Sequence, residues 1–228
     1  MKKFLAVVLA VVMMCGVVLA QDAQNLGTKA GDKSMNFSFG GLATLTTGAA
    51  GPSGGLGLSY FLSSDAAVRF GLQVRSTSTT VPANPATGQT GTDGSTSNFT
   101  LGVAADYLMF MQGATSRVRP YMGAGFSFTM ISTESKNAVI APVVQATTKG
   151  AGASTTLGLM GIVGAEFYLY PEVSVSAEYN LTLFSMTSPA DVEVSSGSTT
   201  VTTKQTSSTQ ILGFGAPGAA NVGVHIYF

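Results

Sequence analysis

Charged side chains are scarce in this sequence. Asp, Glu, Lys and Arg make up 10% of the residues, against roughly 25% in a typical soluble domain. Eleven basic and eleven acidic residues cancel, and without Lys2 and Lys3 nine basic residues face eleven acidic ones. This balance argues against nucleic acid as a partner, because nucleic-acid binding needs a basic surface.

Cysteine occurs once, at Cys15. It lies within residues 1–20, where a Lys-Lys pair precedes an apolar run that ends in small residues, and this pattern predicts a secretory signal peptide. A lipoprotein would be cleaved just before Cys15, but Met14 is bulkier than the small residue usual at that place. Removal of residues 1–20 leaves no cysteine, which excludes disulfides and thiol chemistry from the mature chain.

Long apolar runs are also missing after the N-terminal segment. The chain is 45% hydrophobic with a mean hydropathy of +0.35, yet it has no further stretch of about twenty apolar residues, which a membrane-spanning helix needs. The apolar residues alternate with polar or small ones instead. Alternation in segments of about ten residues is typical of a transmembrane β-barrel.

Eight segments show this period-2 pattern, each with one apolar face and one polar face. We therefore expect an all-β fold, an eight-stranded antiparallel up-and-down barrel over residues 33–228, preceded by a periplasmic lead-in at 21–32. The predicted strands are 33–46, 53–62, 67–77, 97–109, 118–132, 155–169, 173–183 and 210–228.

The predicted connections alternate in length. Residues 63–66, 110–117 and 170–172 form short connections, whereas 80–96, 133–154 and 184–209 are long and rich in Gly, Ser and Thr; residues 47–54 are intermediate. Short periplasmic turns and long external loops are the rule in outer-membrane barrels. An even number of strands then places both chain ends in the periplasm.

The last strand ends on an aromatic residue. Val224, Ile226 and Phe228 share its apolar face. A final strand of this kind is typical of a bacterial outer-membrane barrel, where it is presented to the insertion machinery. We therefore predict these three residues as a C-terminal insertion signal.

Six charged residues fall on the polar faces of the strands. Three are basic and three are acidic, so they can pair inside the barrel, whereas a charge facing lipid at mid-bilayer would cost about 2–4 kcal/mol. The interior of an eight-stranded barrel is just wide enough to be filled by side chains. We predict a salt-bridged network that plugs the lumen, made by Arg69, Arg75, Asp106, Arg119, Glu166 and Glu178.

The residues from about 35 to 228 resemble the small outer-membrane β-barrel family, the eight-stranded OmpA/OmpX-like group. The best-matching stretches are 119–126, 161–183 and 222–228. The resemblance implies a place in the bacterial outer membrane, contact with its lipids and insertion by the barrel-assembly machinery. It also implies roles in envelope integrity, adhesion or small-solute permeation.

Residues for chemistry are few. His225 is the single histidine; no serine stands near it in its own strand, so we expect an interior hydrogen-bonding residue and no enzyme. No cofactor and no metal site are expected, because one histidine and scattered carboxylates do not make a ligand set. The first hypothesis is a non-enzymatic scaffold with exposed loops that can meet an extracellular partner. A narrow porin-like channel is the alternative, and a soluble lipocalin-like calyx is a minor rival.

Overall fold

The computed structural model describes residues 28–40, 53–111, 116–213 and 219–228. Every regular element in these ranges is a β-strand. The predicted signal peptide at 1–20 lies outside the described residues. No helix among the described residues is long and apolar enough to cross a membrane.

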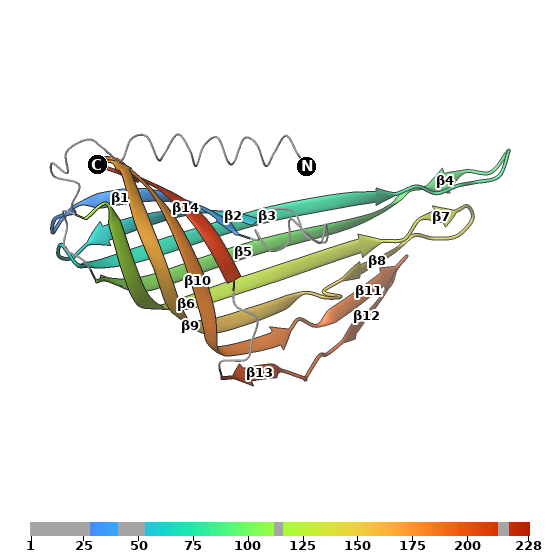
Figure 1. Ribbon diagram of the computed structural model, residues 1–228. Helices are drawn as coiled ribbons and strands as arrows, with labels where there is room; N and C mark the ends of the chain where they lie inside the picture. The colour runs from blue at the N-terminus through green and yellow to red at the C-terminus, as the bar shows by residue number, and fades with distance from the viewer. Residues whose placement is uncertain (1–27, 41–52, 112–115, 214–218) are drawn as a thin grey trace.

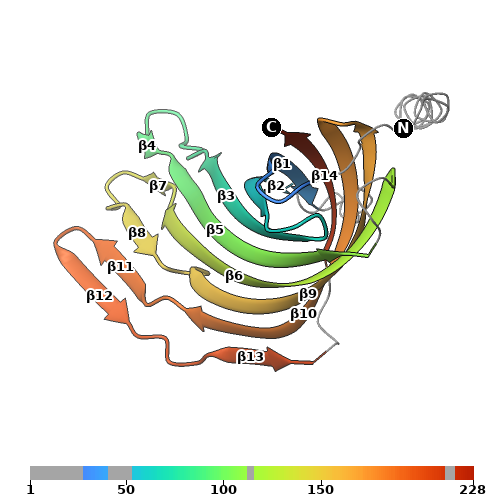
Figure 2. The ribbon, with the colours of Figure 1, turned by 90° about the vertical axis from the view of Figure 1, so that its left-hand side faces the viewer.

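Eight strands close into a ring (Figures 1 and 2). Each strand pairs antiparallel with its neighbours, and the ring is completed where β1 pairs with β14, with Met35 opposite Ile226. Closure leaves no free backbone edge in this part of the wall, as lipid requires. The strands in ring order are β1 (Lys33–Gly40), β2 (Ser53–Phe61), β3 (Ala66–Val81), β5 (Gly94–Phe110), β6 (Val118–Lys136), β9 (Ser154–Tyr170), β10 (Val173–Pro189) and β14 (Ala219–Tyr227).

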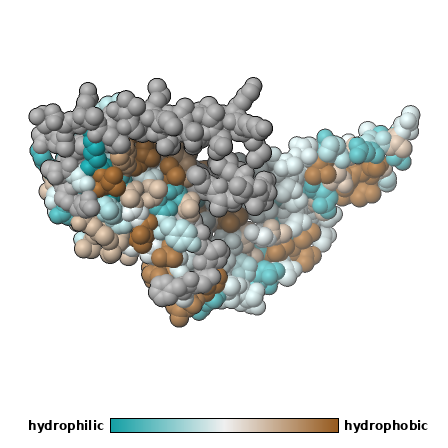
Figure 3. Space-filling model, viewed as in Figure 1, coloured by the Kyte–Doolittle hydropathy of each residue, from teal (hydrophilic) through white to brown (hydrophobic). Residues whose placement is uncertain are grey.

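The predicted faces hold along the described strands, so the eight-stranded antiparallel barrel is confirmed. Outward apolar side chains such as Phe70 and Leu58 are 57% and 53% exposed, whereas inward Asn36 and Arg119 are 5% and 0% exposed. On the face drawn in Figure 3, hydrophobic residues form patches among pale and polar ones along the barrel and its extension. The period of two fixes these faces, because a slip of one residue would turn every side chain to the wrong side.

The long connections differ from the expectation. A strand of about 9–11 residues spans the bilayer, but β3, β5, β6, β9 and β10 have 16 to 19 residues each and continue past the barrel (Figure 1). Their ends are rich in Thr and Ser, and β-branched Thr is common in strands. Four short strands join the sheet of this extension: β8 (Ala146–Lys149), β11 (Val192–Ser196), β12 (Thr199–Thr203) and β13 (Thr209–Leu212). Two more, β4 (Gly91–Thr92) and β7 (Val139–Ile140), pair with each other in a separate sheet.

The predicted final strand at 210–228 is in fact two strands. β13 pairs with the far part of β10, from Phe184 to Thr187, while β14 begins at Ala219 and pairs with β10 from Val173. Gly213, with a φ of 124°, ends the first of them. A positive φ of this kind breaks a strand and is open to glycine.

The described part of the lead-in, residues 28–32, contacts the barrel. Thr28 is 2% exposed, and its hydroxyl donates to the Ser64 carbonyl at 3.3 Å. The Gly31 amide donates to the Phe61 carbonyl at 2.8 Å, and the Phe61 amide donates to the Asp32 carbonyl at 2.9 Å. Residues 28–32 therefore pack on the end of the barrel that carries the short turns, which we name the turn end.

Candidate functional site in the barrel lumen

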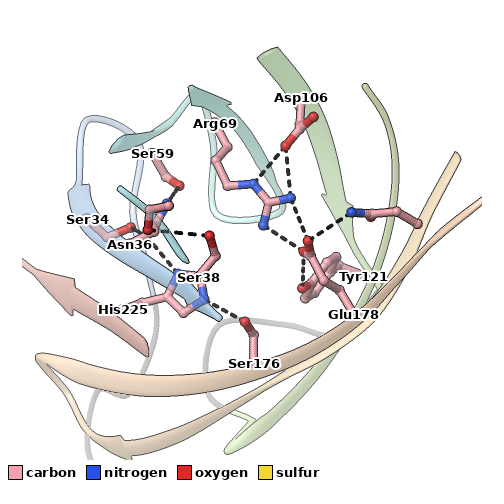
Figure 4. Close-up of polar contacts among 12 residues, drawn as sticks. Ser34, Asn36, Ser38, Ser59, Arg69, Asp106, Tyr121, Ser176, Glu178 and His225 are labelled. Carbon is pink, nitrogen blue, oxygen red and sulfur yellow. Dashed lines mark hydrogen bonds and ion pairs between the residues drawn. The ribbon is translucent and has the colours of Figure 1, made fainter. Parts of the chain in front are cut away.

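The centre of the lumen is crossed by one arginine. Arg69 lies on β3, and its Nε donates to Asp106 Oδ2 on the adjacent β5 at 2.9 Å. Its Nη1 and Nη2 donate to the Glu178 carboxylate at 2.7 and 3.3 Å. Figure 4 shows the guanidinium held between these two acids. We name Arg69, Asp106 and Glu178 the central cluster.

Glu178 stands on the strand farthest from Arg69. β10 lies four strands from β3 in either direction around the ring, so this ion pair spans the full width of the lumen. Tyr121 Oη donates to Glu178 at 3.1 Å, and Asn180 Nδ2 donates to it at 3.4 Å. Glu178 thus has neutral hydrogen-bond donors besides Arg69, which a buried ion pair needs for stability. Among the described residues the buried Asp106 Oδ1 has no hydrogen-bond partner.

A glycine makes room for the tyrosine in this arrangement. A Cβ added at Gly164 would lie 2.5 Å from Tyr121 Cζ and 2.7 Å from its Oη. The hydroxyl end of Tyr121 therefore lies close against the backbone of β9, which is possible because position 164 has no side chain. This local sequence choice allows the Tyr121 hydroxyl to reach Glu178.

A second charged group closes the turn end. Arg119 is fully buried. Its Nη1 donates to Thr28 Oγ1 at 2.6 Å and to Tyr168 Oη at 3.5 Å, and its Nη2 donates to the Ser64 carbonyl. An ion pair to Asp65 at 3.8 Å adds charge compensation. These contacts tie β6 and β9 to the lead-in and to the turn after β2.

Glu166 is the acid of this second group. It stands opposite Arg119 in the β6–β9 register and is 2% exposed. Ser174 Oγ and Tyr227 Oη both donate to its Oε1, and Tyr168 Oη donates to Tyr227 Oη at 3.1 Å. We name Arg119, Glu166 and the residues that donate to or accept from them the turn-end cluster.

Aromatic rings fill the space beside the turn-end cluster. Arg119 lies over the Phe110 ring, 4.5 Å from its centroid, within cation–π distance. Phe61 contacts Phe110 and Tyr227 at ring separations of 5.6 and 5.9 Å. The inward Phe61 and Phe110 were missed at the sequence level, because each follows an apolar neighbour and breaks the alternation.

The six predicted lumen charges are thus placed in three locations. The structure brings Arg69, Asp106 and Glu178 together in the central cluster and sets Arg119 and Glu166 in the turn-end cluster. Arg75 lies on the predicted inward face of β3 but is exposed, beyond the central cluster, where it lines a second pocket with Thr77, Asn98 and Thr100. The predicted single network of six charged residues is therefore wrong.

The predicted insertion signal is on the outside of the barrel. Val224 and Ile226 belong to β14, and Ile226 and Phe228 are 44% and 71% exposed. Their placement is compatible with recognition by another protein, and their role as an insertion signal stays a prediction.

A cavity of about 240 Å³ occupies the lumen around the central cluster. Arg69, Asp106 and Glu178 line it, and so do Ser176 and His225. Among the described residues, no group of three or more His, Cys, Asp or Glu side chains is placed to hold a metal ion. The chemistry that the cavity offers is hydrogen bonding, one cation and two carboxylates.

Comparison with known proteins fits this architecture. A family model described as the outer membrane protein beta-barrel domain matches residues 6–205. The chain belongs to this family. Members of the outer membrane protein beta-barrel domain family are proteins of the bacterial outer membrane, and this is the location of the chain. The family is defined by its barrel, and its description names no reaction.

Solved structures of outer-membrane proteins are similar to this family member. A major outer membrane protein from Thermus thermophilus aligns with a TM-score of 0.47 and 14% identity, covering 86% of this chain and 99% of that one. OprG from Pseudomonas aeruginosa aligns with a TM-score of 0.45 and 13% identity, covering 90% and 99%. Ail from Yersinia pestis aligns with a TM-score of 0.38 and 13% identity, covering 88% and 100%. No curated protein matches the chain.

Proposed function

We propose that this outer-membrane barrel is a structural and interaction protein whose plugged lumen supports an exposed β-sheet. The observation that carries the proposal is the extension of β3, β5, β6, β9 and β10 beyond the barrel, together with β8, β11 and β12. A strand needs only about 9–11 residues to cross the membrane. The remaining residues therefore build a surface on the side opposite the turns, which in this topology is the cell exterior.

The outer edge of this sheet is β12. It pairs with β11 along one side, and no second strand among the described residues pairs with its other side. All five of its residues, Thr199–Thr203, are exposed, and none is charged. An open strand edge presents unpaired amide and carbonyl groups, and an extended segment of a partner can add to it as a further strand.

An edge-binding experiment tests the interaction role. A labelled peptide that copies residues 192–196, the natural neighbour of β12, is expected to bind the refolded protein in detergent. Thr200→Lys with Thr202→Lys should weaken that binding at least about fivefold, because charges on an edge strand block pairing. Ser198→Lys places one such charge in the adjacent turn and is expected to leave binding unchanged. Equal binding by all three proteins would overturn the edge as the docking surface.

A conductance experiment tests the plugged lumen. The refolded mature protein is expected to be silent in a planar lipid bilayer, because Arg69 and Glu178 bridge the lumen and aromatic rings fill the turn end. A heat-modifiable band on an unboiled gel shows that the silent protein is folded. Frequent discrete openings in the wild type would contradict the scaffold.

The second candidate is a narrow channel for small solutes. The lumen cavity of about 240 Å³ favours it, since polar side chains and glycines line this space. In that case the central cluster is the constriction, and Arg69→Met should change both conductance and ion selectivity.

We also propose two partners of the barrel itself. Bilayer lipids contact its outward face, and the barrel-assembly machinery recognises Val224, Ile226 and Phe228.

A further inference from the structure

Three lumen residues on three adjacent strands form a hydrogen-bonded chain. Ser176 Oγ on β10 lies 2.7 Å from His225 Nε2 on β14, and His225 Nδ1 lies 2.7 Å from Asn36 Oδ1 on β1. All three side chains are buried. Figure 4 shows the imidazole standing between the serine and the amide.

The hydrogen bonds around Asn36 set the direction of this chain. Asn36 Nδ2 donates to Ser59 Oγ at 2.6 Å, so Oδ1 is the acceptor, and Ser34 Oγ donates to it at 2.9 Å. His225 Nδ1 therefore carries the hydrogen that faces Asn36 Oδ1. Its Nε2 keeps a lone pair and accepts the Ser176 hydroxyl proton, which is the arrangement that activates a serine nucleophile.

A glycine keeps the meeting point of serine and histidine open. Gly223 stands opposite Ser176 in the β10–β14 register. A Cβ added there would lie 2.6 Å from Ser176 Oγ and 3.0 Å from His225 Nε2. Any other residue at 223 would therefore crowd the atoms that share the proton.

The chain borders a space that can admit a small molecule. Asn36, Ser176, Gly223 and His225 all line the lumen cavity, and so does Arg69, which supplies a positive charge. The volume of about 240 Å³ is below the roughly 300–1,000 Å³ of sites for drug-sized ligands. The cavity therefore restricts an electrophile to a small acyl or sulfonyl group.

We propose that Ser176 is a nucleophile activated by His225, that Asn36 is its positioning residue, and that the site hydrolyses small carboxylic esters entering the lumen. Ser176 Oγ bonds to the ester carbonyl carbon while its proton moves to His225 Nε2. The C–O bond to the alcohol then breaks, and the alcohol leaves with that proton. Water repeats the sequence on the acyl-serine, releasing the acid and restoring the Ser176 hydroxyl.

This inference goes beyond the proposed function and does not rest on it. Peptide binding at β12 does not involve Ser176, so the failure of one leaves the other intact. The site could not be found from the sequence, because the serine is 49 residues from the histidine and lies beside it only through the pairing of β10 with β14.

Covalent labelling tests the proposal. The full mature protein, refolded in detergent, is treated with phenylmethylsulfonyl fluoride, which forms a serine sulfonate and releases fluoride. Peptide mass spectrometry is expected to locate one adduct at Ser176. His225→Gln should slow labelling at least about 100-fold, the usual size of a general-base contribution. The same protein should hydrolyse 4-nitrophenyl acetate with the same dependence on His225.

Matched variants separate chemistry from structure. Ser78→Ala removes an exposed serine outside this cavity and is expected to label at the wild-type rate, whereas Ser176→Ala should not label. Asn36→Asp keeps the acceptor oxygen and should retain labelling, while Asn36→Leu should lose it with a normal folded band on the gel. The absence of any adduct, an adduct spread over several serines, or an undiminished rate in folded His225→Gln overturns the proposal.

Discussion

Replacing Arg119 by alanine is expected to lower the free energy of unfolding by about 3–5 kcal/mol, because a hydrogen bond from a charged group contributes about 1.5–3 kcal/mol and this buried guanidinium donates several. Arg119 is fully buried and donates to Thr28, Tyr168 and the Ser64 carbonyl. Its loss leaves the buried Glu166 facing a site without the positive charge. It also removes the side-chain hydrogen bond from Arg119 to Thr28 of the lead-in.

The matched control for Arg119→Ala is Arg75→Ala. Both arginines have inward parity, but Arg75 is exposed, and exposed substitutions usually change stability by about 0.5 kcal/mol or less. Unfolding by urea in lipid vesicles measures both, with the folded fraction read from the gel shift because the chain has no tryptophan. An equal loss of unfolding free energy in the two variants would show that the buried Arg119 stabilises the barrel no more than the exposed Arg75 does.

The faces of the strands could be predicted from the sequence. Every barrel strand repeats with a period of two, so Arg69 and Arg119 had to point inward once lipid covered the other face. This inference needs no knowledge of pairing, since it depends only on alternation along one strand. The barrel class and the outer-membrane location followed from the same pattern.

The pairing of the lumen charges could not be predicted. Arg69 meets Glu178 across a sequence separation of 109 residues, and that meeting depends on the tilt and stagger of the whole ring. The same stagger places Arg119 near the turn end and Arg75 toward the opposite end of the barrel. The alternation of faces predicts that all six charges point into the lumen. It does not give their positions along the barrel axis, and these positions separate the charges into different groups.

The extension was missed for a different reason. Gly, Ser and Thr in residues 80–96 and 184–209 indicated loops, yet β-branched Thr is also common in strands. Strands that have already paired in the barrel continue to pair beyond it, because each added pair satisfies further backbone groups. The local amino-acid composition therefore did not predict these strands, because pairing with neighbouring strands stabilises them.

Replacing Arg69 by methionine is expected to produce the second large loss, again about 3–5 kcal/mol, because it leaves two buried carboxylates together without their cation. Asp106 and Glu178 are 7% and 8% exposed at their side chains. Tyr121 and Asn180 still donate to Glu178, but neutral donors do not cancel two charges. Urea unfolding in lipid vesicles measures the loss.

A neutral triple variant separates the charge from the shape of the plug. Arg69→Met combined with Asp106→Asn and Glu178→Gln removes all three charges of the central cluster and should recover most of the stability, since replacing a whole buried ionic group is often nearly neutral. If conductance appears in Arg69→Met and persists in the triple variant, the arginine side chain blocks the lumen by its volume. If the triple variant is silent again, repulsion between the two carboxylates opens the lumen. A triple variant as unstable as Arg69→Met would contradict the ionic account, and the stability of the barrel centre would then depend on the guanidinium's hydrogen bonds.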